Sequence, residues 1–472
     1  RSYSMENTIK KDNKLEKTPV KKLIWQLGLP MVVSMVLQAV YNVVDTIFVI
    51  NSSAATQGNA ALTAAFPVQI LIIAIGVGTG VGLNALLSRK LGEKDEETAA
   101  KVAGNGIFLA IVIYAVFLLF GLFLAKPYMK LLTTDETVAE TGAEYLSICC
   151  TLSFGSIGFT VYERFLQATG KTTQTMIAQL SGAAANVILD YVFVIVLDGG
   201  VAGAAYATII GQILSLLIAM LFHYATNKAI KPDLKYIKPD GKIIGLIYKI
   251  GVPAAIMQSL LAVMMFTVLQ VFRIISGKST YALMVNAYGI YYKIMQTALF
   301  AAFGLSNALI TVVSFNKGLK SYTRISQAAK YGIIDTVIVC LVISVVFQIF
   351  ATPVSNLFGL SLPEVSADGV KKADVLAACK QALRIATLGY AFMGVSIAIQ
   401  GVLQGLNNVF KPIIISLLRL IIFVVPLSVL FSLLPAVEQN FWWVFPIAEV
   451  LTATISAFLL LSSLKKAKQE LF

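Results

Sequence analysis

The stretch Gly203–Thr226 reads GAAYATIIGQILSLLIAMLFHYAT and contains no Asp, Glu, Lys or Arg. A helix needs about 20 apolar residues to cross the hydrocarbon core of a bilayer. Inside that core every backbone polar group must find a partner within the protein, and an α-helix provides those partners by itself. This stretch therefore predicts a membrane-spanning helix.

The same character holds along the chain of 472 residues, since 58% of them are hydrophobic and only 13% are charged. Soluble domains carry about 45–50% apolar and about 25% charged residues. The composition excludes a soluble globular enzyme, a disordered chain, a collagen-like chain and a secreted disulfide scaffold. The net charge of +13 comes mostly from residues between apolar runs, so membrane topology explains it better than nucleic-acid binding does. We expect an all-α polytopic membrane protein.

Twelve apolar runs are long enough to span a bilayer. Several exceed the length needed, so tilt or protrusion is expected. The runs are 23–50, 60–88, 99–125, 138–168, 174–197, 203–226, 243–273, 281–315, 325–352, 375–405, 411–434 and 441–464.

Lysine and arginine gather in the loops on one side of this predicted bundle, including the N-terminal segment, the central linker and the tail. Basic loops stay in the cytoplasm. Both termini of this multi-pass plasma-membrane protein are therefore expected there, which an even number of spans satisfies. The polar residues 1–22 do not form a secretory signal. We expect Met5 to be the natural start, with Arg1–Ser4 left over from cloning.

Short motifs recur in the second half of the chain, in the same order and at nearly constant spacing. A repeated order of motifs indicates an internal repeat. The pairs are Gly28-Leu29-Pro30 with Gly251-Val252-Pro253, Asn84-Ala85-Leu86 with Asn307-Ala308-Leu309, and Phe165-Leu166-Gln167 with Val402-Leu403-Gln404.

The repeat divides the chain into two lobes of six spans each. Because six is even, both lobes enter the membrane in the same sense, and such parallel repeats belong to transporters that rock two lobes around a central cavity. The expected parts are a cytoplasmic N-terminal segment 1–22, an N-terminal lobe 23–226, a cytoplasmic linker 227–242, a C-terminal lobe 243–464 and a cytoplasmic tail 465–472.

No motif supports an enzyme or an ATP-driven pump. Gly277-Lys278-Ser279 lacks the first glycine of a phosphate-binding loop, because Phe272 stands in its place. His223 is the only histidine and lies near one end of the sixth span, and the four cysteines lack metal-ligand spacing. We expect no catalytic residue, no cofactor, and no metal beyond Na⁺ at an ion-coupling site.

Ionisable side chains inside spans are costly and are functional candidates by default. Tyr41 with Asp45, and Asn186 with Asp190, have i,i+4 spacing and so share a helix face, and Thr208 follows in the sixth span. At a rise of about 1.5 Å per residue, all of them lie in the outer half of the N-terminal lobe. The oxygen atoms of these side chains could bind Na⁺. Burial of a carboxyl group beside a second carboxylate raises its pKa, so the site could also bind H⁺, and the sequence leaves both coupling ions as alternatives.

The repeat supplies an internal control for these polar groups. Their counterparts in the second lobe are apolar, and a shared fold does not explain polar groups in one lobe only. Ion coupling is therefore expected in the N-terminal lobe. The alternative is that Asp45 faces the outer headgroups and Asp190 only pairs locally. The apolar counterparts are Met264, Val268, Phe423 and Leu427.

Five motifs carry a resemblance to a known family: Gly28–Pro30 (GLP), Gln38–Asp45 (QAVYNVVD), Leu166–Gly170 (LQATG), Asn186–Asp190 (NVILD) and Gly203–Thr208 (GAAYAT). On these residues the chain resembles the multidrug and toxic compound extrusion (MATE) transporters over nearly its full length. The resemblance implies twelve helices in two lobes and cation-coupled antiport of amphipathic, often cationic compounds.

In the DinF-like branch of that family, the cation or proton site uses residues that match Asp45, Asn186, Asp190 and Thr208, with Tyr41 beside them. The NorM-like branch also uses carboxylates in spans seven and ten. This chain has none in the body of either span. The resemblance therefore favours the DinF-like branch or the similar MepA-like pumps.

Substrate contacts are expected from methionine, which adapts its shape, and from tyrosine, which attracts cations. Pro30 is the expected hinge. Of the charged groups inside the C-terminal lobe, Lys293 and Glu449 are placed to pair, while Lys293 and Arg419 would make the lobe net basic. Anionic or lipid-like substrates therefore stay open. The expected substrate-cavity residues are Gln38, Gln258, Met257, Tyr288, Tyr292 and Lys293.

The sequence thus predicts a secondary active multidrug efflux antiporter that exchanges its substrates for H⁺ or Na⁺ by alternating access. The alternative is a lipid-linked saccharide or lipid flippase of the same superfamily. The expected partners are small-molecule drugs or toxins and the lipid bilayer, without nucleic acid, and the protein is expected to act as a monomer.

Overall fold

The computed structural model describes residues 14–50, 55–133, 135–230, 236–275, 278–359, 364–365 and 369–471. Within these ranges the chain forms helices joined by short turns, plus one isolated antiparallel bridge between Val365 and Lys371. The helical architecture confirms the all-α class that the composition predicts.

The first half of the chain builds the N-terminal lobe, a name used here for α2 to α9. Long apolar runs form its helices, and acidic caps start some of them: the Asp95 carboxylate accepts from the backbone N–H of Thr98 at the start of α4. The elements are α1 (Lys14–Lys17), α2 (Val20–Ile50), α3 (Ala55–Gly92), α4 (Glu96–Leu119), η1 (Phe120–Leu124), α5 (Ala125–Leu132), α6 (Glu136–Thr151), α7 (Phe154–Ala168), α8 (Thr172–Asp190), η2 (Tyr191–Val196) and α9 (Gly200–Thr226).

The second half builds the C-terminal lobe, a name used here for α10 to α19. Its elements are α10 (Gly241–Ile275), α11 (Lys278–Gly318), α12 (Tyr322–Ile349), α13 (Ala351–Phe358), α14 (Lys372–Ala386), η4 (Thr387–Gly389), α15 (Tyr390–Gly405), α16 (Phe410–Leu417), η5 (Leu418–Ile422), α17 (Val424–Ser432), α18 (Val437–Asn440), η6 (Phe441–Trp443) and α19 (Val444–Leu471).

Among the described residues, 11 helical stretches are long and apolar enough to cross a membrane, and the number reaches 12 when α6 and α7 count as one span. These two helices meet at a 41° bend. At the bend the Ser153 hydroxyl donates to the carbonyl oxygen of Cys150, so a side chain has entered the helical hydrogen-bond ladder. Twelve spans match the predicted runs.

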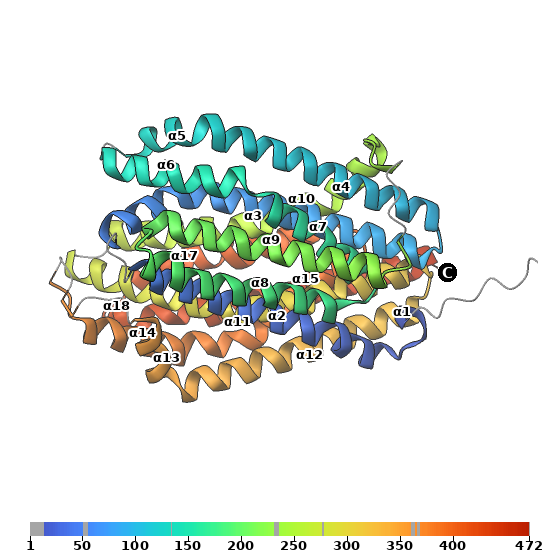
Figure 1. Ribbon diagram of the computed structural model, residues 1–472. Helices are drawn as coiled ribbons and strands as arrows, with labels where there is room; N and C mark the ends of the chain where they lie inside the picture. The colour runs from blue at the N-terminus through green and yellow to red at the C-terminus, as the bar shows by residue number, and fades with distance from the viewer. Residues whose placement is uncertain are drawn as a thin grey trace, which may run out of the picture.

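The bundle has two distinct ends. Figure 1 shows α1 and the C-terminus at one end and α18 at the other. The first of these ends, here called the basic end, also carries the α3–α4 turn with Lys90 and Lys94 and the α11–α12 turn with Lys317 and Lys320. The opposite end is called the far end. Both described chain ends lie at the basic end, as an even number of spans requires.

The turns at the basic end show the internal repeat directly. Lys94 and Lys320 both have positive φ, at 60° and 55°, and each lies in a turn with the same backbone hydrogen bonds. Gly170 and Asn407 form a second matched pair, at 76° and 58°. This second pair agrees with the match of Leu166-Gln167 to Leu403-Gln404.

The Lys94–Lys320 pair corrects the predicted match between the second and eighth spans. It places Asn84 at the position of Ile310, and not of Asn307 as the motif comparison predicts. Three-letter motifs of common apolar and small residues match by chance, whereas a left-handed turn fixes the register.

The apolar cores show where the lobes join. One core cluster contains side chains from both lobes near the basic end, such as Leu23 and Leu87 with Val312 and Leu403. Toward the far end each lobe has its own cluster among the described side chains. The lobes therefore share a core at the basic end and separate toward the far end.

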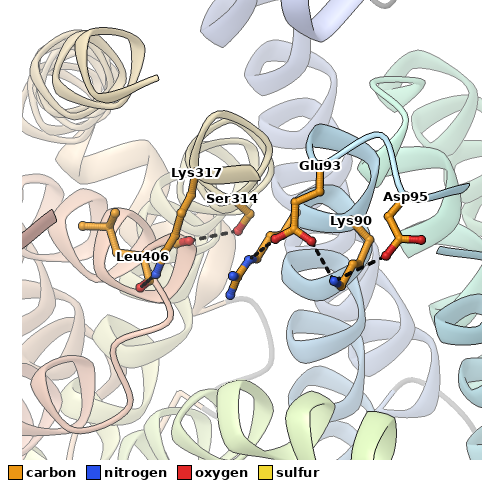
Figure 2. Close-up of polar contacts among 8 residues, drawn as sticks. Lys90, Glu93, Asp95, Ser314, Lys317 and Leu406 are labelled. Carbon is orange, nitrogen blue, oxygen red and sulfur yellow. Dashed lines mark hydrogen bonds and ion pairs between the residues drawn. The ribbon is translucent and has the colours of Figure 1, made fainter. Parts of the chain in front are cut away.

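Polar contacts line the two sides of the joined basic end (Figure 2). On the N-terminal lobe, Lys90 Nζ lies 2.6 Å from Glu93 Oε2 and 3.6 Å from Asp95 Oδ2. On the C-terminal lobe, Lys317 Nζ donates to the carbonyl oxygen of Leu406 at 2.6 Å. Burial raises the pKa of Glu93, but hydrogen bonds from Lys90 and Arg89 outweigh it and hold the pKa below its ordinary value.

Residues 14–18, here called the N-terminal clasp, touch both lobes at this end. Leu15 is fully buried and lies near Gly170 and Leu27 of the N-terminal lobe. From α12 of the C-terminal lobe, Arg324 Nη2 donates to the carbonyl oxygens of Leu15 at 2.8 Å and Thr18 at 3.0 Å. The clasp thus bridges the junction of the lobes.

Candidate functional site

A cavity of about 220 Å³ lies inside the N-terminal lobe, among α2, α3, α7, α8 and α9. Apolar side chains form part of its wall, but many of the lining residues are polar. Such a mixture suits amphipathic ligands. The polar lining residues are Gln38, Ser156, Thr160, Glu163, Arg164, Gln179, Asn186, Thr208, Gln212 and Ser215.

Two residues of the predicted ion site meet in this cavity. Asn186 Nδ2 of α8 donates to Thr208 Oγ1 of α9 at 3.4 Å, and both residues line the cavity wall. The helices approach closely here because Gly182 and Gly211 face each other across the contact, and a Cβ at Gly211 would meet the carbonyl oxygen of Gly182 at 2.6 Å.

Asp190 follows Asn186 by one turn on the same face of α8 and is fully buried. It is the last residue of α8, and the wider π-helical turn η2 begins immediately after it. Single π-helical turns inside helices are frequent at functional sites. The backbone of Tyr41 and Asp45 belongs to α2, but the side chains of both lie outside the described residues.

The donor atoms can be compared with the needs of a cation. Asn186 Oδ1 is buried and accepts no hydrogen bond within the described part of the chain. A carbonyl-type oxygen beside a hydroxyl and a carboxylate suits Na⁺, whereas a buried carboxylate alone suits H⁺. In the described ranges there is no group of three or more His, Cys, Asp or Glu that could hold a metal ion.

A buried charged group that the sequence analysis missed lies in the same cavity. Arg164 Nη1 donates to Gln167 Oε1 at 2.7 Å, and Gln167 Nε2 donates to Glu163 Oε1 at 2.8 Å. Arg164 Nη2 also lies 3.6 Å from Glu163 Oε2. Gly80 of α3 makes room for this guanidinium, because a Cβ there would lie 2.9 Å from Arg164 Nε. The adjacent Glu-Arg pair inside an apolar run was the available signal.

The predicted substrate residues fall in different places. Gln38 lines the cavity, where it accepts from Gln179 Nε2 at 2.8 Å. Met257 is buried and accepts from Gln404 Nε2 at its sulfur, at 3.2 Å, while Gln258 is half-buried on α10. Only Gln38 of the predicted set therefore lines the cavity in the described structure.

Tyr288 and Tyr292 lie in the apolar core of the C-terminal lobe. The Tyr288 ring is fully buried and stacks on Phe445 with a centroid distance of 6.2 Å. The Tyr292 hydroxyl donates to the carbonyl oxygen of Leu261 at 3.5 Å. In this state of the protein both rings pack inside the lobe.

The charged residues of the C-terminal lobe pair differently from the prediction. Arg419 Nε lies 2.6 Å from Glu449 Oε1, and their side chains are only 5% and 13% exposed. The expected pairing of Lys293 with Glu449 is therefore wrong. The packing of η5, between α16 and α17, against α19 brings Arg419 to Glu449 instead. Lys293 is exposed, and no hydrogen bond or ion pair joins it to another described residue.

The repeat relates this ion pair to the cavity of the other lobe. The spacing of the Gly170–Asn407 pair places Arg419 at the position of Gly182 and Glu449 at that of Gln212, which both line the N-terminal cavity. In the C-terminal lobe an ion pair thus occupies the space that corresponds to the cavity of the N-terminal lobe.

Pro30, the predicted hinge, lies inside α2. It follows Gly28, which packs closely against Leu305 of α11. A proline inside a helix removes one backbone hydrogen bond and favours a bend. The position of Pro30 is compatible with a hinge, which remains a prediction.

Comparison with known proteins relates most of the chain to one group of transporters. A family model described as MatE matches residues 30–192 and 253–430. The multidrug export protein MepA of Staphylococcus aureus (strain MRSA252) is 26% identical over 302 residues, which are 64% of this chain and 65% of that protein. The multidrug export protein MepA of Staphylococcus haemolyticus (strain JCSC1435) is 25% identical over 379 residues, 80% of this chain and 81% of that protein.

A solved structure shows the same fold. It is described as the outward-facing conformation of a multidrug resistance MATE family transporter of the MOP superfamily. It superposes with a TM-score of 0.90 at 22% identity and covers 97% of this chain and 99% of that chain. The arrangement of the two lobes is therefore common to both proteins.

Proposed function

Since the chain belongs to the MatE family of multidrug efflux transporters, which are not enzymes, we propose that it exports amphipathic, often cationic compounds in exchange for H⁺ or Na⁺. The substrates, the coupling ion and the N-terminal location of coupling are parts of this proposal. The relatives named as multidrug export proteins support the substrate class, although the match spans 65% of the first relative's own length.

The observation that carries the proposal is the polar cavity of the N-terminal lobe. Gln38, Asn186 and Thr208 line it, and the buried Asp190 follows on the same helix face. Carboxylates inside spans are rare and mark ion and proton pathways, and burial favours the binding of a proton or a cation. Ion binding at Asp190 and Asn186 would therefore change the wall of the cavity that holds the substrate.

The shared core at the basic end supports alternating access. The lobes join at that end and separate toward the far end, so the cavity would open toward the far end. The clustered basic turns favour a cytoplasmic basic end. The proposal includes a bend at Pro30 when the ion binds, a plasma-membrane location with cytoplasmic termini, and action as a monomer in the lipid bilayer.

The test is ethidium transport by the full chain in proteoliposomes, under an imposed proton gradient or an imposed sodium gradient. Wild type is compared with Asp190→Asn, which removes the charge and keeps the size. We expect one gradient to drive transport by the wild type and neither to drive it in the variant. The effective gradient then identifies the ion.

Asp198→Asn is the matched control, because it makes the same change in the turn after η2, where asparagine also tolerates positive φ. It should transport like the wild type. Thr208→Val and Thr208→Ser separate the hydroxyl from the shape of the side chain, and only the valine variant should lose coupling. Coupled transport that survives Asp190→Asn would contradict coupling at this residue.

A lipid or lipid-linked saccharide flippase is the second candidate. The observation that favours it is the exposed Lys293 in the C-terminal lobe, because the negative phosphate of a lipid is attracted to a lysine ammonium. The pairing of Arg419 with Glu449 weakens it, since the lobe then carries less free positive charge than predicted. Gradient-independent flipping of a fluorescent lipid would favour this candidate over the antiporter.

A further inference from the structure

Lys293 lies on an exposed face of α11. Between Ala287 and Met295 every side chain is buried except Gly289 and Lys293, which are one turn apart. A Cβ added at Gly289 would meet nothing within 4 Å. The half-buried Gln296 and Thr297 continue the same face.

The residues of this face argue against contact with lipid. Helices that face lipid expose large apolar side chains, as α4 does with Ile111 and Val116 and α12 does with Leu341. Within its described side chains, residues 280–318, α11 exposes no large apolar residue. Charged residues within spans almost always face the bundle interior or a water-filled cavity. Because α11 contacts α2 and α3 of the other lobe, the separation between the lobes is the aqueous space nearest to this face.

The packing of α11 on α2 gives the depth of Lys293. The two helices run in opposite directions and approach closely where a Cβ at Gly304 would lie 2.7 Å from the Val32 nitrogen. Equal steps from this contact toward the far end reach Lys293 on α11 and Val43 on α2. Gln179 of α8 donates to Gln38 of α2, which places Asn186 of α8 near the level of Val43. Lys293 therefore lies at about the depth of Asn186 and Asp190.

We propose that Lys293 is a selectivity residue on the C-terminal wall of the substrate pathway and binds the carboxylate of zwitterionic or anionic amphiphiles. This inference rests on the proposed export function and adds a substrate class to it. The lysine ammonium offers three hydrogen-bond donors and a full charge. In the described structure they are not engaged by a protein acceptor, so an incoming carboxylate has no partner to displace.

The opposite lobe would hold the rest of such a molecule. The N-terminal cavity supplies apolar wall and neutral polar groups. Among the described side chains its one lining carboxylate is Glu163, which is already bound by Gln167 and Arg164. An amphiphile with an apolar body and one carboxylate would therefore match both walls. A purely cationic compound would use the N-terminal wall and gain nothing from Lys293.

The test uses two dyes that differ in one group: a rhodamine with a free carboxylate, which is a zwitterion at neutral pH, and its methyl ester, which is a cation. Gradient-driven transport of each dye is measured in proteoliposomes for wild type, Lys293→Gln and Lys293→Arg. We expect Lys293→Gln to raise the KM for the carboxylate dye about tenfold, the value of one hydrogen bond to a charged group. The ester should be unaffected, and Lys293→Arg should stay near the wild type.

Lys130→Gln is the matched control, an exposed lysine of α5 changed in the same way. Binding of both dyes to purified protein, followed by fluorescence polarisation, gives a readout that does not need coupling. Weaker binding of the carboxylate dye alone supports the inference. An equal effect on both dyes, or no effect on either, overturns it. Absence of gradient-driven transport of both dyes by the wild type would instead count against the antiporter, and the binding comparison would still decide the role of Lys293.

Discussion

The carbonyl oxygen of Phe315 occupies the space that a Cβ atom on Gly92 would fill, and the carbonyl oxygen of Arg89 does the same to Gly318. The two contacts are related by the internal repeat, because the same spacing separates Gly92 from Gly318 and Arg89 from Phe315. Small residues let helix backbones approach this closely. The ends of α3 and α11 are therefore joined by a matched pair of glycine contacts.

Gly92→Ala and Gly318→Ala should each push the two helices apart and favour opening of the basic end. Overpacking of this kind costs about 1–3 kcal/mol, which shifts a two-state equilibrium by about tenfold or more. Labelling of a cysteine introduced at the buried Ser314, in a background without the four native cysteines, should accelerate accordingly. Gly245→Ala is the control, since nothing lies within 4 Å of a Cβ there. Unchanged labelling in both glycine variants would show that the contact does not hold this end closed.

Arg324→Gln should release the N-terminal clasp. Arg324 donates to the carbonyl oxygens of Leu15 and Thr18 and, through Nε, to Asn316 Oδ1 at 2.7 Å. Hydrogen bonds from a charged donor contribute about 1.5–3 kcal/mol, so the clasp should detach in a large fraction of molecules. Limited proteolysis should then cut near Lys14 and Lys17 much faster than in the wild type. Arg384→Gln, an exposed arginine of α14, should leave the cleavage rate unchanged.

Acidification should lower the stability of the protein by protonating Glu93 and Asp95 at the basic end. The hydrogen bonds from Thr98 and the charge of Lys90 hold the pKa of Asp95 below its ordinary value of 3.8, and the pKa of Glu93 lies below 4.5. Groups with lowered native pKa values stabilise the fold fully above the ordinary values, and that contribution disappears as the pH falls through the native ones. Thermal unfolding should therefore become easier below about pH 4.5. Glu93→Gln should reduce this dependence of the unfolding temperature on pH. Glu144→Gln on α6, the control, should leave the dependence unchanged.

Arg419 and Glu449 should be strongly coupled in stability. Removing one partner of a buried ion pair leaves an uncompensated charge and costs about 3–5 kcal/mol. Arg419→Met and Glu449→Leu should each lower the unfolding temperature markedly, while the double variant should recover most of the loss. A double-mutant cycle of thermal unfolding in detergent measures the coupling. Additive single effects would mean that the two side chains do not depend on each other.

Much of this architecture could be predicted from the sequence, because apolar runs of bilayer length leave little choice of structure. The polar residues Asn186 and Thr208 could also be found, since few polar groups occur in spans and the repeat shows where they are unmatched. Pairing between distant helices could not be found. From the sequence, Glu449 could form an ion pair with either Lys293 or Arg419. Only the packing of α16–α17 against α19 shows that Arg419 is the partner.

The direction in which each side chain points also could not be predicted from the sequence. Tyr288 and Lys293 lie five residues apart on α11, yet one is fully buried and the other is exposed. Only the neighbours of α11 decide which face is which. The Glu163–Arg164 pair was missed for a related reason, because two opposite charges side by side in an apolar run do not alter its mean hydropathy enough to interrupt it.

The N-terminal clasp has a consequence for how the protein is made. Leu15 leaves the ribosome before either lobe, and Arg324 follows it 309 residues later. Domains fold as the chain emerges, so the first lobe can insert and pack before α12 of the second lobe has been made. The clasp closes only after α12 has been inserted. Its closure would therefore join a first lobe that is already packed to a second lobe that is still being made.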